Sequence, residues 1–152
     1  MPLRMMPATS DHQEHRHAQE RAEAPVLFVV DDDASTLALI SEIAEDSGWV
    51  ARGFTRLRAL RASLADQPGP NLLILDDDLP DGSGGDLARQ LRSDPRMEGV
   101  PLLVCTAAHP IRQAEIGAWA PVVSKPFELG EIERFLDAAR RRGGDRSHGT
   151  AG

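Results

Sequence analysis

The chain has 152 residues, 41% of them hydrophobic and 27% charged, and a formal net charge of −7. These values are typical of one globular domain with polar tails, and the negative charge disfavours broad electrostatic binding to nucleic acid or anionic lipid. Its single cysteine, Cys105, excludes a disulfide framework, and its longest apolar runs are too short to cross a membrane. We therefore expect a cytoplasmic protein that binds neither nucleic acid nor a membrane.

The two ends of the chain differ in composition from its middle. Residues 1–24 are rich in His, Glu, Arg and Gln, and residues 143–152 are mostly Gly and polar residues. Segments of this kind bury too little apolar surface to offset the entropy of ordering, so we expect two disordered tails. The folded domain is expected over residues 25–142. The histidines between residues 12 and 17 are read as incidental to the first tail.

In the first half of the domain, short apolar runs alternate with amphipathic stretches. Residues 26–30 (VLFVV) predict a strand buried on both faces, and Ser35 is placed to cap a helix that Gly48 ends. Residues 49–53 predict a short second strand. Leu57, Leu60 and Leu64 then share one face of a second helix.

The second half repeats this alternation. Strands are predicted at residues 71–75, 100–105 and 121–123. The helices between and after them are marked by Leu87 and Leu91, by residues 111–117, and by a stripe of Leu129, Ile132, Leu136 and Ala139. Five β–α units in succession predict an α/β fold with a parallel sheet and helices on both faces.

Acidic and other polar residues follow the predicted strands. Asp31, Asp32 and Asp33 come after the first strand, and Asp76, Asp77 and Asp78 after the third; Thr106 and Lys125 follow the fourth and fifth. In a parallel sheet these strand ends open onto one edge, where ligands of such folds bind. So many carboxylates repel one another unless a cation lies among them, and oxygen ligands of this kind suit Mg²⁺.

The same residues could support phosphoryl transfer. A carboxylate beside Mg²⁺ can act as a nucleophile and form an aspartyl phosphate, for which Thr106 would supply a hydroxyl and Lys125 a positive charge. Lys125 is the only lysine among 17 basic residues. A compact ammonium at this position therefore points to a requirement that the planar guanidinium of Arg does not meet.

Four segments resemble the receiver domain of bacterial two-component response regulators. They are VLFVVDDD at 26–33, LLILDDDLPDGSG at 72–84, LLVCTA at 102–107 and VVSKPF at 122–127. The resemblance spans residues 25–141 and implies a doubly wound, flavodoxin-like (βα)5 fold. Its five-stranded parallel sheet would have the order 2-1-3-4-5.

The resemblance also implies a role for each matching residue. Asp76 would accept the phosphoryl group, and Asp31, Asp32, Asp76 and the main-chain carbonyl of Asp78 would hold Mg²⁺. Thr106 would be the switch hydroxyl and Lys125 would contact the phosphoryl group, with a cis bond between Lys125 and Pro126. The phosphoryl donor would be a sensor histidine kinase or a histidine phosphotransfer protein, and a downstream protein would receive the signal.

Two features depart from the family pattern. Val122 stands where the family usually has Phe or Tyr, three residues before the lysine, and the interval from Thr106 to Lys125 is 19 residues, about three fewer than expected. Both changes fall on the surface that usually carries the output. We therefore expect phosphorylation to move residues 106–125 only weakly.

Two alternatives remain open from the sequence. ILDDDLP at 74–80 is similar to the D-x-D motif of haloacid-dehalogenase-type phosphatases, which would make the protein a small Mg²⁺-dependent enzyme rather than a signalling domain. A degenerate receiver that acts only as a binding module is the other alternative. The small size argues against the first, and the complete set of acidic, hydroxyl and lysine positions argues against the second. Only a short stretch follows the final helix, so no output domain is expected there.

Overall fold

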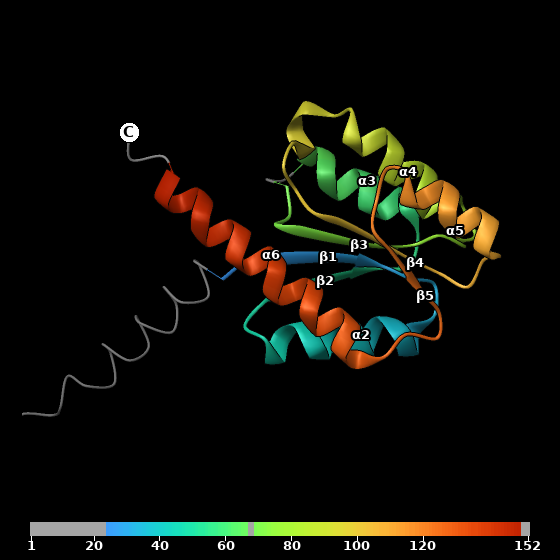
Figure 1. The fold of residues 1–152 in the computed structure, drawn as a ribbon, viewed down its shortest axis with the longest axis horizontal. Helices are drawn as coiled ribbons and strands as arrows, with labels where there is room; N and C mark the ends of the chain where they lie inside the picture. Colours follow the sequence, from blue (N-terminus) through green and yellow to red (C-terminus); the bar gives the residue numbers. More distant parts are fainter. Residues whose placement is uncertain (1–23, 67–68, 150–152) are drawn as a thin grey trace, which may run out of the picture.

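The computed structural model describes residues 24–66 and 69–149. Within them, five strands form one parallel sheet in the order β2-β1-β3-β4-β5, which confirms the predicted doubly wound fold and strand order (Figure 1). The strands are β1 (Val26–Val30), β2 (Val50–Phe54), β3 (Leu72–Asp76), β4 (Leu102–Thr106) and β5 (Val122–Ser124). β3 and β4 are buried along their whole length, as strands covered by helices on both faces must be.

The helices form two layers around the sheet. They are α2 (Ala34–Asp46), α3 (Leu57–Asp66), α4 (Gly84–Arg92), a short 3-10 turn η1 (Pro95–Met97), α5 (Pro110–Gly117) and α6 (Leu129–Gly149). α2 and α6 cover one face, and α3, α4 and α5 cover the other (Figure 1). Each layer has its own apolar cluster: Ile40, Ile43, Ile132 and Leu136 on the first face, and Leu57, Leu60, Leu87 and Ile116 on the second.

The structure corrects three local expectations. Asp33, not Ser35, caps the first helix. The helix begins at Ala34, so its N-cap position is residue 33, and the Asp33 carboxylate accepts a hydrogen bond from the Ser35 N–H at 2.9 Å. Leu129 is 47% exposed and does not join the buried stripe of α6, since it lies in the first turn, at the edge of the domain.

The third correction concerns the end of α6. The helix continues to Gly149, past residue 142 where a tail was expected, and no proline interrupts residues 143–149. The predicted tail over residues 1–24, with its histidines, lies outside the described residues except for Ala24, as do residues 150–152. None of the described helices is both long enough and apolar enough to span a membrane.

Candidate functional site

The carboxyl ends of three neighbouring strands bring Asp31, Asp76 and Thr106 together. Asp31 directly follows β1, Asp76 is the last residue of β3, and Thr106 is the last residue of β4. All three side chains are buried, with exposures of 2%, 5% and 2%. They are the polar or charged residues that the described part of the protein buries, so the hydrophilic interior of the domain is concentrated at this edge of the sheet.

Lys125 closes the site from the end of β5. Its main-chain N–H donates to the Thr106 carbonyl at 2.8 Å, which holds the loop after β5 against β4. Its ammonium lies 2.8 Å from Asp31 Oδ2 and 3.2 Å from Asp76 Oδ1, so one cation bridges the two buried carboxylates. The bond between Lys125 and Pro126 is cis, as the resemblance implied.

The environment of Asp76 favours its neutral form. Burial raises the pKa of Asp76 to about 6, and the charge of Asp31 adds to that increase, while Lys125 opposes it. Burial would lower the pKa of Lys125, but its contacts with Asp31 and Asp76 outweigh this and raise it. The site therefore holds Lys125 charged and leaves Asp76 only weakly stabilised as an anion.

Three carboxylates at this edge could hold a cation. Oxygens of Asp31, Asp32 and Asp76 all lie within 4.8 Å of one another, and Asp32 is exposed while the other two are buried. Such a set fits Mg²⁺, which takes hard oxygen ligands, binds through few carboxylates and keeps several waters. Lys125 balances only part of this negative charge, so a divalent cation would relieve the repulsion that remains.

Asp78 and Thr106 lie beside these carboxylates. The Asp78 N–H approaches Asp76 Oδ1 at 3.4 Å, while the Asp78 side chain is exposed. The Thr106 hydroxyl accepts a hydrogen bond from the Ala108 N–H at 3.0 Å. The roles of the Asp78 carbonyl as a metal ligand and of Thr106 as a switch remain predictions. Cys105 is 1% exposed and belongs to the core, and burial raises the pKa of its thiol to about 12, which keeps it protonated.

Asp77 points away from this site into a separate network that the sequence did not reveal. Its Oδ1 accepts hydrogen bonds from the Ser83 hydroxyl at 2.6 Å and from the Gly85 N–H at 3.0 Å. Arg112 of α5 reaches the same carboxylate at 3.3 Å and the Ser83 hydroxyl at 2.9 Å. Burial alone would raise the pKa of Asp77, but these donors outweigh it and lower the pKa.

The network joins α5 to the start of α4. Arg112 also contacts Asp86 of α4 at 3.2 Å, and the Trp119 indole donates to the Gly85 carbonyl at 2.9 Å. Gly84 allows α4 to begin directly against the sheet, because a Cβ there would collide with the Asp76 carbonyl oxygen. Ser83 three residues before Asp86 is a spacing typical of a helix start and could have been noticed, but no local pattern pairs Arg112 with a residue 35 positions away.

Known proteins share both the sequence pattern and the fold. The chain is 35% identical over 123 residues to the phosphate regulon transcriptional regulatory protein PhoB of Rhizobium meliloti, a match that covers 78% of this chain and 53% of that protein. It is 34% identical over 121 residues to the KDP operon transcriptional regulatory protein KdpE of Escherichia coli, covering 77% of this chain and 51% of that one. The chain thus spans about half the length of these curated relatives.

Solved structures match the fold at lower sequence identity. The chemotaxis response regulator CheY4 of Vibrio cholerae superposes with a TM-score of 0.67 at 20% identity, covering 76% of this chain and 98% of that one. The receiver domain of the Francisella response regulator 1452 gives 0.69 at 19% identity, covering 78% and 98%. A family model described as the response regulator receiver domain matches residues 27–137. The chain therefore belongs to the response regulator receiver family of two-component signalling proteins.

Proposed function

We propose that this receiver accepts a phosphoryl group on Asp76 from a histidine kinase or a histidine phosphotransfer protein, in a Mg²⁺-dependent phosphorelay. The observation that carries the proposal is the position of Lys125, whose ammonium lies within 3.2 Å of Asp76 and bridges it to Asp31. This places a fixed positive charge beside the carboxylate that would become phosphorylated. A downstream protein would then read the phosphorylated state.

In the proposed transfer, a carboxylate oxygen of Asp76 attacks the phosphorus of a phosphohistidine. The new bond is between that oxygen and phosphorus, the phosphorus–nitrogen bond breaks, and the released imidazole takes up a proton. Lys125 balances the charge of the phosphoryl oxygens, and the Thr106 hydroxyl, at the end of the neighbouring strand, is available to donate to one of them. A Mg²⁺ ion held by Asp31, Asp32, Asp76 and the Asp78 carbonyl would supply further positive charge there.

The proposal is tested by incubating the intact chain with acetyl phosphate and Mg²⁺. We expect a single phosphoryl group per chain, seen as a mass increase that hydroxylamine removes, and we expect chelation of Mg²⁺ to prevent it. Steady turnover of a phosphate monoester would instead favour the phosphatase alternative. A chain that acquires no adduct under conditions that phosphorylate a control receiver would favour the degenerate binding module.

A further inference from the structure

The edge strand β5 is shorter than the strand beside it. β5 has three residues, whereas β1, β2, β3 and β4 have five each. Pairing between β4 and β5 starts at Val104 with Val122, so Leu102 and Leu103 have no partner in β5. Pro121 stands just before β5, and because proline has no N–H it cannot donate the next hydrogen bond of the ladder.

The main chain of Leu102 faces this unpaired part of the edge. Val104 donates to the Pro121 carbonyl, and the Thr106 carbonyl accepts from Lys125, so these residues direct their main-chain groups toward β5. Main-chain groups alternate in direction along a strand, so Leu102, two residues before Val104, directs its N–H and C=O to the same side. Leu102 is 2% exposed and lies two residues before the first pair with β5, so a strand added at this edge could form main-chain hydrogen bonds with it.

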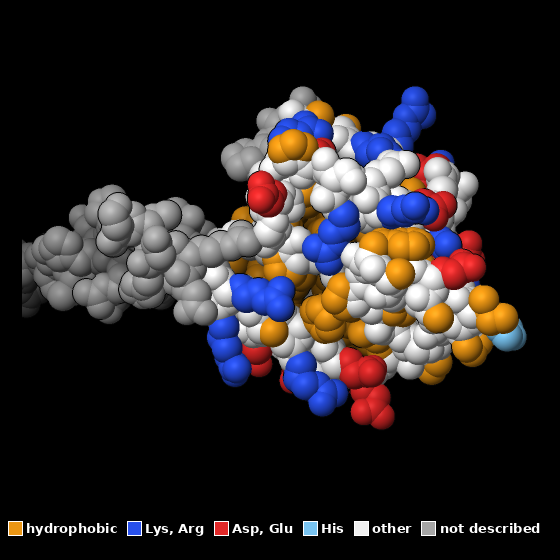
Figure 2. Space-filling view, turned by 45° about the horizontal axis from the view of Figure 1, so that its top comes forward, with side chains coloured by type: hydrophobic (Ala, Val, Ile, Leu, Met, Phe, Trp, Pro, Cys, Tyr) orange, Lys and Arg blue, Asp and Glu red, His pale blue; other side chains and the backbone are white. Residues whose placement is uncertain are grey.

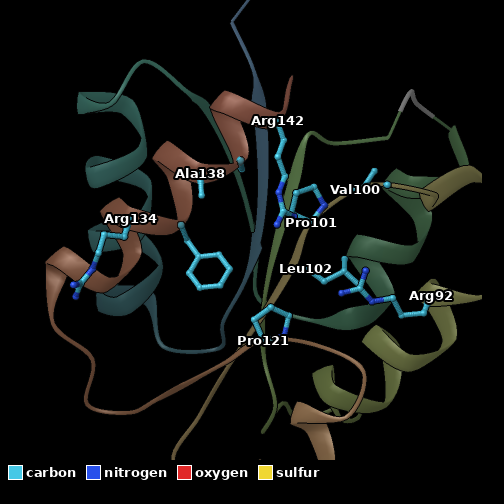
Figure 3. A pocket seen from close by; sticks show the side chains of 11 residues that line it. Arg92, Val100, Pro101, Leu102, Pro121, Arg134, Ala138 and Arg142 are labelled. Atoms are coloured by element: carbon cyan, nitrogen blue, oxygen red, sulfur yellow. The ribbon is translucent and has the colours of Figure 1, made fainter. Parts of the chain in front are cut away.

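A pocket of about 600 Å³ lies at this place, at the end of the sheet opposite to Asp76. Its apolar lining includes Val100, Pro101, Leu102, Pro121 and Phe135. Figure 3 shows Pro101 and Pro121 between α6 on one side and Arg92 on the other. Figure 2 shows apolar side chains in a hollow of this face, with basic side chains and some acidic ones around it.

The charge at the pocket is opposite to the charge of the whole chain. Arg142 from α6 and Arg92 from α4 extend toward the pocket from opposite sides, while Arg134 lies along α6 and points away (Figure 3). Arg92 also donates to the Trp119 carbonyl at 2.8 Å, which fixes its position. Among the described residues that line the pocket none is acidic, although the chain carries a net charge of −7.

We propose that this pocket binds an extended peptide segment of a partner protein, which pairs with the start of β4 through Leu102 and carries two adjacent acidic residues. Successive side chains of a strand point to opposite faces of the sheet. Two neighbouring carboxylates would therefore reach Arg142 on the α6 face and Arg92 on the α4 face. Addition of a strand to an open sheet edge is an established way of binding peptides, and it does not depend here on phosphorylation of Asp76.

The test is a titration of the ¹⁵N-labelled full chain with the blocked hexapeptide Ac-Thr-Val-Glu-Glu-Val-Thr-NH₂, followed by NMR. We expect saturable shifts of the amides of Gly99, Val100, Leu102, Ala139 and Arg142, with no comparable change at residues 31–33 and 76–80. Two control peptides distinguish binding through the acidic side chains from binding through main-chain hydrogen bonds. One has Lys in place of both Glu residues, and the other is N-methylated at both Glu residues and cannot donate ladder hydrogen bonds from these two positions.

Two matched arginine variants measure how much the charge of the pocket contributes to peptide binding. Arg142→Gln is expected to weaken binding about fivefold, the effect of losing one partly exposed ion pair. Arg141→Gln removes the same charge from the neighbouring residue of α6, which does not line the pocket, and is expected to change binding less than twofold. The circular dichroism of both variants should match that of the parent chain.

Three results would overturn the proposal. The first is an absence of saturable shifts at the pocket, or equal binding of the Glu, Lys and N-methylated peptides. The second is a dependence of the pocket amide shifts on protein concentration without peptide, which would assign this face to a second copy of the chain. The third is nuclear Overhauser contacts between residues 1–23 and the pocket in the free protein, which would assign it to the chain's own N-terminal segment.

Discussion

Asp76 and Asp77 are consecutive in the sequence but lie in opposite environments. Asp76 shares a buried site with Asp31 and Lys125, and burial raises its pKa to about 6. Asp77 receives hydrogen bonds from Ser83, Gly85 and Arg112, and its pKa is lowered. Burial disfavours the charged form of the first carboxylate, while the second accepts hydrogen bonds that attach α4 and α5 to the sheet. Two consecutive aspartates are therefore expected to differ in role, the first in the proposed phosphoryl transfer and the second in stability.

The largest expected difference is in phosphorylation. Asp76→Asn should abolish the hydroxylamine-sensitive adduct formed with acetyl phosphate, because it removes the nucleophile. Asp77→Asn should retain one phosphoryl group per chain, since its side chain points away from Lys125. Intact mass spectrometry of both variants measures this difference, and an adduct on the Asp76 variant that equals the parent's would show that another residue accepts the phosphoryl group.

The two variants should also change stability in opposite directions. Asp77→Asn should lower the free energy of unfolding by about 1–3 kcal/mol, because partly buried donors of Ser83, Gly85 and Arg112 lose a charged acceptor. Asp76→Asn should raise it or leave it unchanged without Mg²⁺, since it removes one of several crowded negative charges. Urea denaturation measures both, with the exposed Asp137→Asn as the control that should change little.

Asp76 and Asp77 should also contribute to the pH dependence of stability in different pH ranges. The pKa of Asp76 is about 6 in the folded protein against an ordinary 3.8, so between these values the folded state holds a proton that the unfolded state has released. Without Mg²⁺, stability should therefore rise as the pH falls from 7 to 4, by on the order of 1 kcal/mol.

Asp77 affects stability at lower pH. Its pKa is lowered in the folded protein, so the stability that it provides is lost only as the pH falls below 3.8, the ordinary pKa of an aspartate. Denaturation of Asp76→Asn at several pH values provides the control. A gain of the same size in this variant between pH 7 and pH 4 would show that another group is responsible.

The smallest expected effect concerns the output surface. Beryllofluoride should shift the amides of residues 31–33 and 76–80 strongly and those of 109–123 weakly, because Val122 has no ring to move and Arg112 holds α5 to α4. NMR of the free and beryllofluoride-bound protein measures both groups.

Arg112→Gln tests the second of these causes. The variant should increase the beryllofluoride shifts over residues 110–117 if Arg112 restrains α5. Large shifts over 109–123 already in the parent chain would contradict the expectation and indicate a conventional switch.

Much of this fold could be predicted because its signals are local. The runs VLFVV and LLIL are apolar without interruption, which distinguishes strands covered on both faces, and their ends place Asp31 and Asp76 at one edge of the sheet. Strand limits were correct to within one or two residues. The cap of α2 was misplaced by two residues because Asp33, Ser35 and Thr36 are all competent caps.

The parts that could not be predicted depend on contacts between distant segments. In the sequence, Arg112 cannot be distinguished from an ordinary surface arginine, and only the packing of α5 on α4 brings it to Asp77. The pocket at the start of β4 likewise arises from a short neighbouring strand and from α6, which lie far apart in the sequence.

The central claim is that of two adjacent carboxylates only Asp76 is the phosphoacceptor. The direct measurement is reduction of the phosphorylated parent chain with borohydride, which converts an aspartyl phosphate to homoserine, followed by tandem mass spectrometry of the peptide that contains residues 72–92. We expect homoserine at position 76 and intact aspartate at 77 and 78. Homoserine at position 77 or 78 would contradict it.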